Sequence, residues 1–270
     1  LVRSFVDSGS LSTLYNSAYL TPEDIRISPL GQPGYYPAVW HMLCALAVEM
    51  TGCSVTVAMN ASIVVFFGVV YPLSTMMLLA MLLPNDRIVL VCGAFVLPFF
   101  AGFWSPLYLE GPLFPFMAGL CVVPLALAET LVALRRFCTG ECRCSLVLVL
   151  LSMAALGMLH PGALFAYLLV ADMYLLSASS DKGEIRFGET WVPFRLVVLV
   201  LATGITITWL SFTQLPAFSS TVTYNWKPDA SFFDAFVQAF TFSFASHSSS
   251  TLSPQYVLSS LVCIGSVVSI

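Results

Sequence analysis

The chain has 270 residues, of which 59% are hydrophobic and only 9% are charged, and its formal net charge is −4. Soluble domains carry about 25% charged residues, so this composition excludes a soluble enzyme and a disordered chain. Nucleic-acid binding is excluded too, because it needs a clustered excess of Lys and Arg. The mean hydropathy of +0.91 therefore predicts a polytopic membrane protein.

The first fifty-one residues divide into a polar stretch and a short apolar stretch. Residues 1–36 are rich in Ser, Tyr, Pro and Gly, and we expect them to form an external loop. The thirteen residues Ala38–Met50 are apolar, but at about 1.5 Å per residue such a helix is shorter than a hydrocarbon core of about 30 Å. Residues 37–51 are therefore predicted to lie along the membrane interface, with Trp40 at the level of the headgroups. The alternative is that this helix spans, which would move residues 1–36 with Arg3 and Arg26 to the other side.

The following apolar runs predict six transmembrane helices within residues 55–213, because helices satisfy their own backbone hydrogen bonds in lipid. The expected fold is thus an all-α transmembrane bundle with a juxtamembrane helix. The runs are Val55–Leu83, Ile88–Trp104, Phe114–Leu134, Ser145–Leu159, Gly162–Ala178 and Val192–Thr213.

Residues 214–254 are expected to form a second external loop, and residues 255–270 a truncated seventh span. Within the loop, the start Asp229-Ala230-Ser231 and the i, i+3, i+4 spacing of Phe233, Phe236, Val237 and Phe240 predict a capped amphipathic helix on the outer leaflet. Because the chain starts without Met and stops inside an apolar run, we expect it to be an internal fragment of a longer protein.

Basic residues set the predicted orientation in a cytoplasmic (plasma) membrane. Seven of the ten Lys and Arg residues fall in the alternate loops Asn85–Arg87, Arg135–Cys144 and Ser179–Arg195. Cytoplasmic loops carry such an excess, so these three loops are placed inside. The short loop Ser105–Leu113 and the turn at His160 then face outward.

Three of the eight cysteines, Cys138, Cys142 and Cys144, lie close together in one predicted cytoplasmic loop. A zinc site is one interpretation, but structural zinc sites use four ligands and a second pair does not follow. Reduced cytoplasmic thiols are the alternative that we favour.

The segment Tyr35-Tyr36-Pro37-Ala38-Val39-Trp40-His41 leads through a short apolar helix and Gly52 into a long span. This order resembles the first external loop of GT-C (C-type) glycosyltransferases, which use polyprenyl-phosphate sugars. Together with His160-Pro161-Gly162 it looks like an uncharacterised actinobacterial membrane family grouped with that superfamily. The resemblance implies a GT-C-like fold with a catalytic acid that would precede Leu1, and it assigns a second acidic position to Glu110 by loop order.

Sugar transfer from a lipid phosphate needs a carboxylate for the acceptor and positive charge for the leaving phosphate. Glu110 is the candidate catalytic carboxylate, although a solvated loop acid would look the same. His160 is the second catalytic candidate, against the alternative that it caps a helix C-terminus. A divalent metal is one possible source of the positive charge, but the sequence assigns it no ligands, and no cofactor is certain.

Three further residues are candidates for substrate binding. His41 on the short helix is able to bind phosphate or metal, with contact to lipid headgroups as the favoured alternative. Tyr35 and Tyr36 are placed to line an acceptor groove, and interfacial anchoring explains them equally well. Glu129 and Asp172 are acids inside apolar runs, and pairing with basic loop residues is the simpler interpretation.

Together these features predict a GT-C-like glycosyltransferase, or an inactive relative, that uses a polyprenyl-phosphate sugar on the external face for cell-envelope glycan assembly. The expected partners are the lipid bilayer and the sugar donor. The alternative is a transporter or flippase subunit for a lipid or small solute. Transporters favour internal repeats and broken helices at the midplane, and the sequence shows no repeat.

Overall fold

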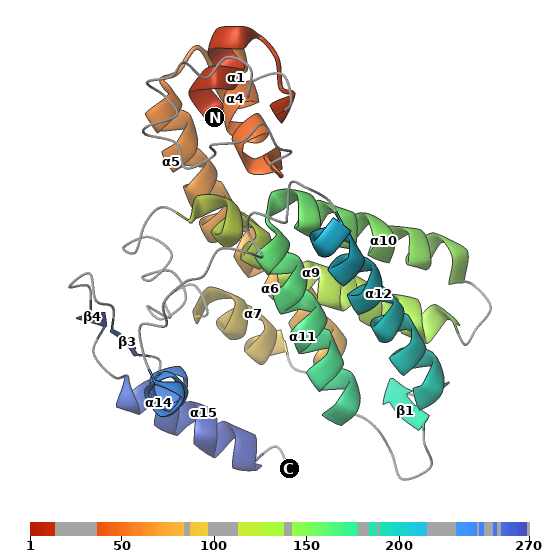
Figure 1. Cartoon of the computed structure of the whole chain (residues 1–270). Coiled ribbons are helices and arrows are strands. Elements are labelled where there is room, and N and C mark those ends of the chain that lie inside the picture. The colour runs from red at the N-terminus through yellow and green to blue at the C-terminus, as the bar shows by residue number, and fades with distance from the viewer. Residues whose placement is uncertain are drawn as a thin grey trace.

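The computed structural model describes residues 1–13, 37–83, 87–96, 113–137, 142–177, 184–187, 190–214, 231–241, 243–245, 251–252 and 255–268. These residues are mostly helical, which confirms the predicted helical class (Figure 1). The helices are α1 (Val2–Ser8), α4 (Val39–Thr51), α5 (Val55–Val65), the π-helical η2 (Phe66–Val70), α6 (Tyr71–Leu82), α7 (Arg87–Val96), α9 (Phe114–Phe137), α10 (Cys142–Leu159), α11 (Pro161–Ser177), α12 (Phe194–Gln214), α14 (Phe232–Thr241) and α15 (Tyr256–Val268).

Two helices in the described part of the chain are long and apolar enough to cross a membrane. They are Val55–Leu82, with 28 residues, and Phe114–Arg136, with 23 residues. At about 1.5 Å per residue both exceed a hydrocarbon core of about 30 Å. The helix Val39–Thr51 is apolar but shorter, as its length in the sequence predicts.

Two short antiparallel hairpins were not predicted. The strands are β1 (Glu184–Phe187) with β2 (Thr190–Pro193), and β3 (Phe244–Ala245) with β4 (Thr251–Leu252). In the first hairpin Ile185 lies opposite Val192, and Val192 is fully buried against Leu131 and Ala171. The apolar run that starts at Val192 therefore begins as a strand, and α12 starts only after Pro193.

The first long helix contains an interruption that its sequence explains. Pro72, in the first turn of α6, lacks a backbone N–H, and its ring would collide with the carbonyl of Gly68 in a regular α-helix. The π-helical turn η2 precedes it, and the N–H of Tyr71 bonds to the carbonyl of Phe66, five residues back. The helix thus continues through the proline. Its first half, α5, packs on α4, and its second half, α6, packs on α7 and α9.

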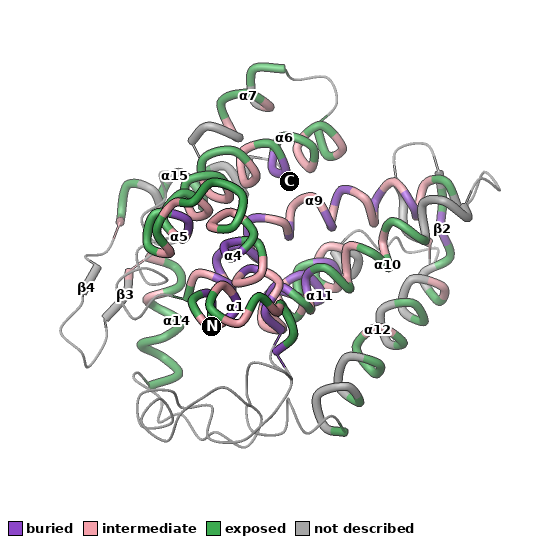
Figure 2. The backbone as a smooth tube through the Cα atoms, turned by 90° about the horizontal axis from the view of Figure 1, so that it is seen from above, coloured by how far each residue is buried: buried purple, intermediate pink, exposed green. Residues whose placement is uncertain are grey.

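Helix α9 is the centre of the molecule and contacts α4, α6, α10 and α11. Its buried face consists largely of small side chains, which let helix backbones approach closely. The closest approach is at Gly119, where an added Cβ would lie 2.5 Å from the Cβ of Ala163 on α11. Buried residues follow α9, α4 and α11 in Figure 2, while α5 and α14 are mostly exposed.

The sequence predicts Trp40 at the level of the headgroups, and in the structure its side chain is buried inside the protein. Helix α1 packs on α4 and buries Val2 and Phe5 in one cluster with Trp40, which is 1% exposed. The opening segment was predicted as a loop, but Val2, Phe5 and Val6 have the i, i+3, i+4 spacing of one helix face. Helix α1 ends at Gly9, whose left-handed backbone (φ 62°) favours glycine.

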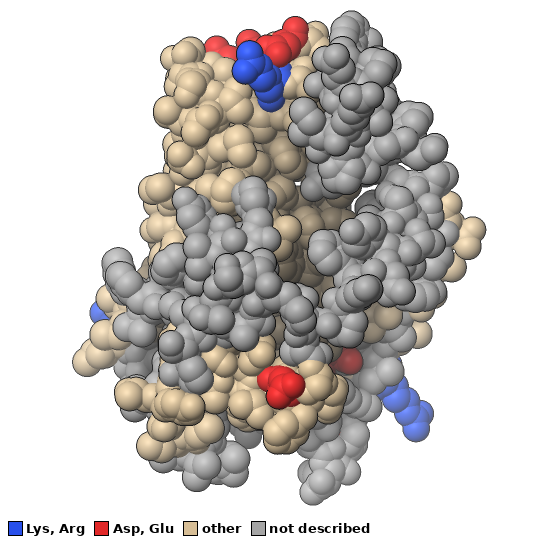
Figure 3. All heavy atoms as spheres, turned by 60° about the vertical axis from the view of Figure 1, so that its left-hand side comes forward, with Lys and Arg blue, Asp and Glu red and all other residues tan. Residues whose placement is uncertain are grey.

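Large apolar side chains cover much of the outer surface. Val64, Leu150 and Leu199 are each more than 60% exposed. On the face seen in Figure 3, the acidic and basic atoms of the described residues form only small patches. Soluble monomers rarely expose apolar surface of this extent. The exposed surface therefore agrees with membrane association.

Helix α14 has the predicted cap and apolar face. The hydroxyl of Ser231 accepts a hydrogen bond from the backbone N–H of Asp234 (3.1 Å) and donates one to its carboxylate (2.6 Å). The rings of Phe236 and Phe240 lie in contact on one side, 4.6 Å apart, and both are more than half exposed. The amphipathic pattern in the sequence thus forms the expected helix.

Candidate functional site

His160 lies in the tight turn between α10 and α11. Its backbone N–H bonds to the carbonyl of Leu156, and its own carbonyl accepts from the N–H of Ala163 (both 2.9 Å). The backbone N–H of Gly162 donates to Nδ1 of the imidazole at 3.0 Å. Because Nδ1 accepts, the neutral ring carries its proton on Nε2. The turn therefore fixes both the orientation and the tautomer of His160.

The aromatic ring of Phe116, on the first turn of α9, covers the His160 imidazole. The ring centroids lie 5.0 Å apart. A Cβ at Gly162 would lie 3.1 Å from both Nδ1 of His160 and the ring of Phe116, so a glycine keeps this space open. Burial lowers the pKa of His160 below its ordinary value and favours the neutral form at pH 7.

His41 lies on the side of α4 that faces the protein. Cys44 and Ala45 on that side are buried, while Leu43 and Leu46 on the other side are more than 40% exposed. Burial, and secondly the positive charge of the Leu1 amino group, lower the pKa of His41 to about 4. His41 is thus a half-buried neutral imidazole that packs against the protein, and its contact with lipid headgroups stays a prediction.

The start of α9 connects the surroundings of the two histidines. Trp40 meets the His41 ring edge-on, with centroids 5.1 Å apart, and lies 5.6 Å from the ring of Phe114. Two residues further on, Phe116 contacts His160. Trp40 and Leu159 also belong to the same buried cluster. Residues that are more than one hundred positions apart in the sequence thus gather at one end of the helices.

Several predicted site residues lie outside the described part of the chain. These are Tyr35, Tyr36 and Glu110, together with Cys138 of the possible zinc cluster. The described residues contain no group of three or more His, Cys, Asp or Glu side chains that is able to hold a metal ion. Among the described residues, His41 and His160 both lie near the start of α9. No third metal-ligating side chain is grouped with them there.

A second polar site lies towards the other end of α9. The hydroxyl of Ser152 on α10 donates a hydrogen bond to the carboxylate of Glu129. Glu129 also lines a hollow between α6, α9 and α10, together with Arg136. Glu129 was singled out in the sequence as an acid within an apolar run, whereas Ser152 carried no signal because its role depends on helix packing.

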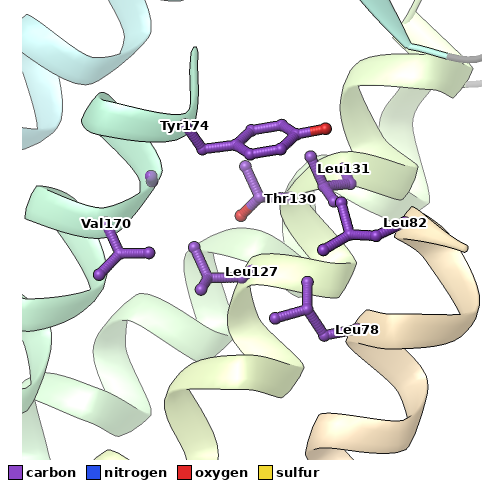
Figure 4. Close-up of a pocket in the computed structure, with 8 residues that line it drawn as sticks. Leu78, Leu82, Leu127, Thr130, Leu131, Val170 and Tyr174 are labelled. Carbon is purple, nitrogen blue, oxygen red and sulfur yellow. The ribbon is translucent and has the colours of Figure 1, made fainter. Parts of the chain in front are cut away.

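A mainly apolar hollow of about 100 Å³ lies between α6, α9 and α11 (Figure 4). Leu78 and Leu127 are among its lining residues, and no charged side chain lines it. Thr130 and Tyr174 also line the hollow, and the hydroxyl of Thr130 lies 2.6 Å from that of Tyr167.

The helical architecture, the two candidate spans and the exposed apolar surface define a helical protein with the features of a membrane-associated chain. The chain belongs to DUF6541, a family of unknown function, whose sequence pattern matches residues 1–270. No curated protein and no solved structure matches the chain.

Proposed function

We propose that the chain belongs to the multi-pass proteins of the plasma membrane, with α5–η2–α6, α7, α9, α10, α11 and α12 as its transmembrane helices. The support comes from two helices long enough to cross a bilayer and from apolar side chains exposed on the others. Arg135 and Arg136 lie at the C-terminal end of α9, and the positive-inside rule places this end in the cytoplasm. His41 and His160 then lie towards the external face.

On that face we propose a GT-C-like glycosyl transfer site, or the remnant of one in an inactive relative. Its donor is a polyprenyl-phosphate sugar, and its product belongs to the cell envelope. Glu110 is the proposed general base, four residues before Phe114 in the sequence. His160 is proposed to donate a hydrogen bond from Nε2 to substrate oxygen, and Tyr35, Tyr36 and His41 to line the acceptor side.

One observation carries this proposal. The short helix α4 packs against α9 with His41 and Trp40 on its inner side, and the α10–α11 turn with His160 meets the start of the same helix α9. A GT-C-like active site requires such a meeting of an interfacial helix with loop residues of later spans. Neutral imidazoles do not balance a phosphate charge, so a cation from elsewhere, such as a divalent metal, is part of the proposal.

The test uses the full-length protein in lipid nanodiscs with a panel of labelled polyprenyl-phosphate sugars. We expect transfer or saturable binding, and a loss of transfer of about 10²-fold or more in Glu110→Gln, as for removal of a general base. Glu49→Gln is the matched control, because Glu49 is an exposed acid on α4. Absence of both turnover and binding would refute the proposal.

The rival function is lipid or solute transport, and one feature of the structure favours it. The π-helical turn Phe66–Val70 followed by Pro72 interrupts the longest helix near its middle, and π-turns are frequent at functional sites. The same reconstituted protein in sealed vesicles distinguishes the two. Transport moves the intact lipid-linked sugar across the bilayer, whereas transfer releases the lipid phosphate.

A further inference from the structure

The hollow between α6, α9 and α10 has the size and the lining of a site for a small apolar ligand. Its volume is about 410 Å³, within the range of about 300–1,000 Å³ that ligand pockets have and above the roughly 150 Å³ that holds a benzene molecule. Met77 lines it from α6 and Leu148 from α10, and these side chains are 51% and 48% exposed. The hollow therefore opens on the apolar outer surface, where a ligand enters from the bilayer.

Two contacts beside the hollow hold its three helices together. Nη2 of Arg135 on α9 donates a hydrogen bond to the carbonyl of Met81 on α6 (3.0 Å). The hydroxyl of Ser152 on α10 donates to the carboxylate of Glu129 on α9. The walls are thus in place before a ligand binds, and a preformed site binds more tightly than one that the ligand must order.

Glu129 places a carboxylate in a lining that is otherwise largely apolar. Its Oε2 accepts the hydrogen bond from Ser152, whereas Oε1 accepts none from the described residues. Within the described part of the chain, Glu129 also forms no ion pair. A carboxylate at membrane depth is costly without a partner of opposite charge. A cation in the hollow would supply that charge and would find Oε1 as its acceptor.

Arg136 also lines the hollow, but it already takes part in an interaction of its own, so we assign it no contact with the ligand. It lies seven residues after Glu129, about 10 Å further along the helix axis. A cation that is hydrogen-bonded to Glu129 at about 3 Å is attracted roughly three times as strongly as a positive charge about 10 Å away repels it. The charges on α9 therefore favour one positive charge at the carboxylate.

We propose that this hollow binds a small lipophilic amine in its protonated, singly charged form. The ammonium group donates a hydrogen bond to Oε1 of Glu129, and the apolar body lies between Met77 and Leu148. A neutral molecule of the same shape would leave the carboxylate without a cation, and the carboxylate would repel an anion. This inference is independent of the proposed transferase function.

The probe is naphthylmethylamine and the control ligand is naphthylmethanol. Both have the same fluorescent apolar body, and only the amine is charged at pH 7. Equilibrium dialysis measures their binding to the full-length protein in phosphatidylcholine nanodiscs, and empty nanodiscs correct for partition into lipid. We expect one saturable site that binds the amine about tenfold or more tightly than the alcohol, as one charge-assisted contact provides.

Three variants separate the contributions. Glu129→Gln keeps an oxygen that accepts from Ser152 but removes the charge, so it should bind the amine about tenfold more weakly and the alcohol as before. Leu148→Trp should fill the hollow and abolish the saturable binding of both ligands. Asp172→Asn changes an acid on α11 that does not line the hollow and should bind as the unmodified protein does. Equal binding of amine and alcohol by the unmodified protein, or unchanged amine binding in Glu129→Gln, would overturn the inference.

Discussion

Replacing Gly119 by alanine tests the central packing of the molecule. The new Cβ would lie 2.5 Å from the Cβ of Ala163, whereas carbon atoms in contact prefer about 3.5–4.0 Å. Helices α9 and α11 must therefore move apart by roughly 1 Å or distort. Overpacking of this kind costs about 1–3 kcal/mol, and the higher helix propensity of alanine returns up to about 1 kcal/mol. The expected net loss is about 1–2 kcal/mol.

Thermal unfolding in detergent micelles measures this loss. Gly68→Ala is the matched control, because it adds the same methyl group to a helix where nothing lies within 4 Å of the new Cβ. We expect Gly119→Ala to unfold at a lower temperature than both the unmodified protein and Gly68→Ala.

The double variant Gly119→Ala with Ala163→Gly gives a second, independent check. It moves the methyl group from α11 to α9 and removes the clash, so the two changes should be less destabilising together than the sum of their separate effects. Strict additivity, or a Gly119→Ala protein as stable as Gly68→Ala, would refute the close approach of α9 and α11.

Three other predictions concern stability. Trp40→Ala should cost about 3–5 kcal/mol, measured by denaturant unfolding, because its side chain is buried between α1, α4 and α9. His41 has a folded pKa of about 4, below its ordinary 6.5. As the pH falls, the unfolded chain therefore binds a proton at His41 at a higher pH than the folded protein does. The free energy of unfolding is therefore greatest above pH 6.5 and falls by about 3 kcal/mol or less as the pH approaches 4. The melting temperatures at pH 7.5 and pH 5 should differ less in His41→Gln than in the unmodified protein. Ser231→Ala removes the cap of α14 and should cost about 1 kcal/mol of local stability, seen as faster hydrogen exchange at the start of α14 only.

Much of the helical structure follows from hydropathy and segment length. The apolar run Phe114–Leu134 forms α9, and Ser145–Leu159 forms most of α10, because a long apolar segment has few other ways to satisfy its backbone. The short apolar run Ala38–Met50 likewise predicts a helix too short to span a bilayer, and it forms the 13-residue helix α4.

Tertiary contacts determine the helix orientations and the strand that hydropathy alone does not predict. Both faces of α4 carry apolar side chains, so the packing of α1 and α9 determines that His41 and Trp40 point inward. Val192 looks like the start of a helix, but it pairs as a strand because Leu131 and Ala171 cover it. The contact between Glu129 and Ser152 joins two apolar runs whose relative rotation no periodicity specifies.

The π-turn at Phe66–Val70 also changes the phase of the helix that contains it. One residue corresponds to a rotation of about 100° in an α-helix. A turn that holds one extra residue therefore shifts, by one position in the sequence, which residues of α6 face a given neighbour. Ala58 is the buried residue of α5, and beyond the turn Ser74 is buried and donates to the carbonyl of Cys121 at 2.6 Å. The turn thus lies in one continuous helix whose first half packs on α4 and whose second half packs on α7 and α9.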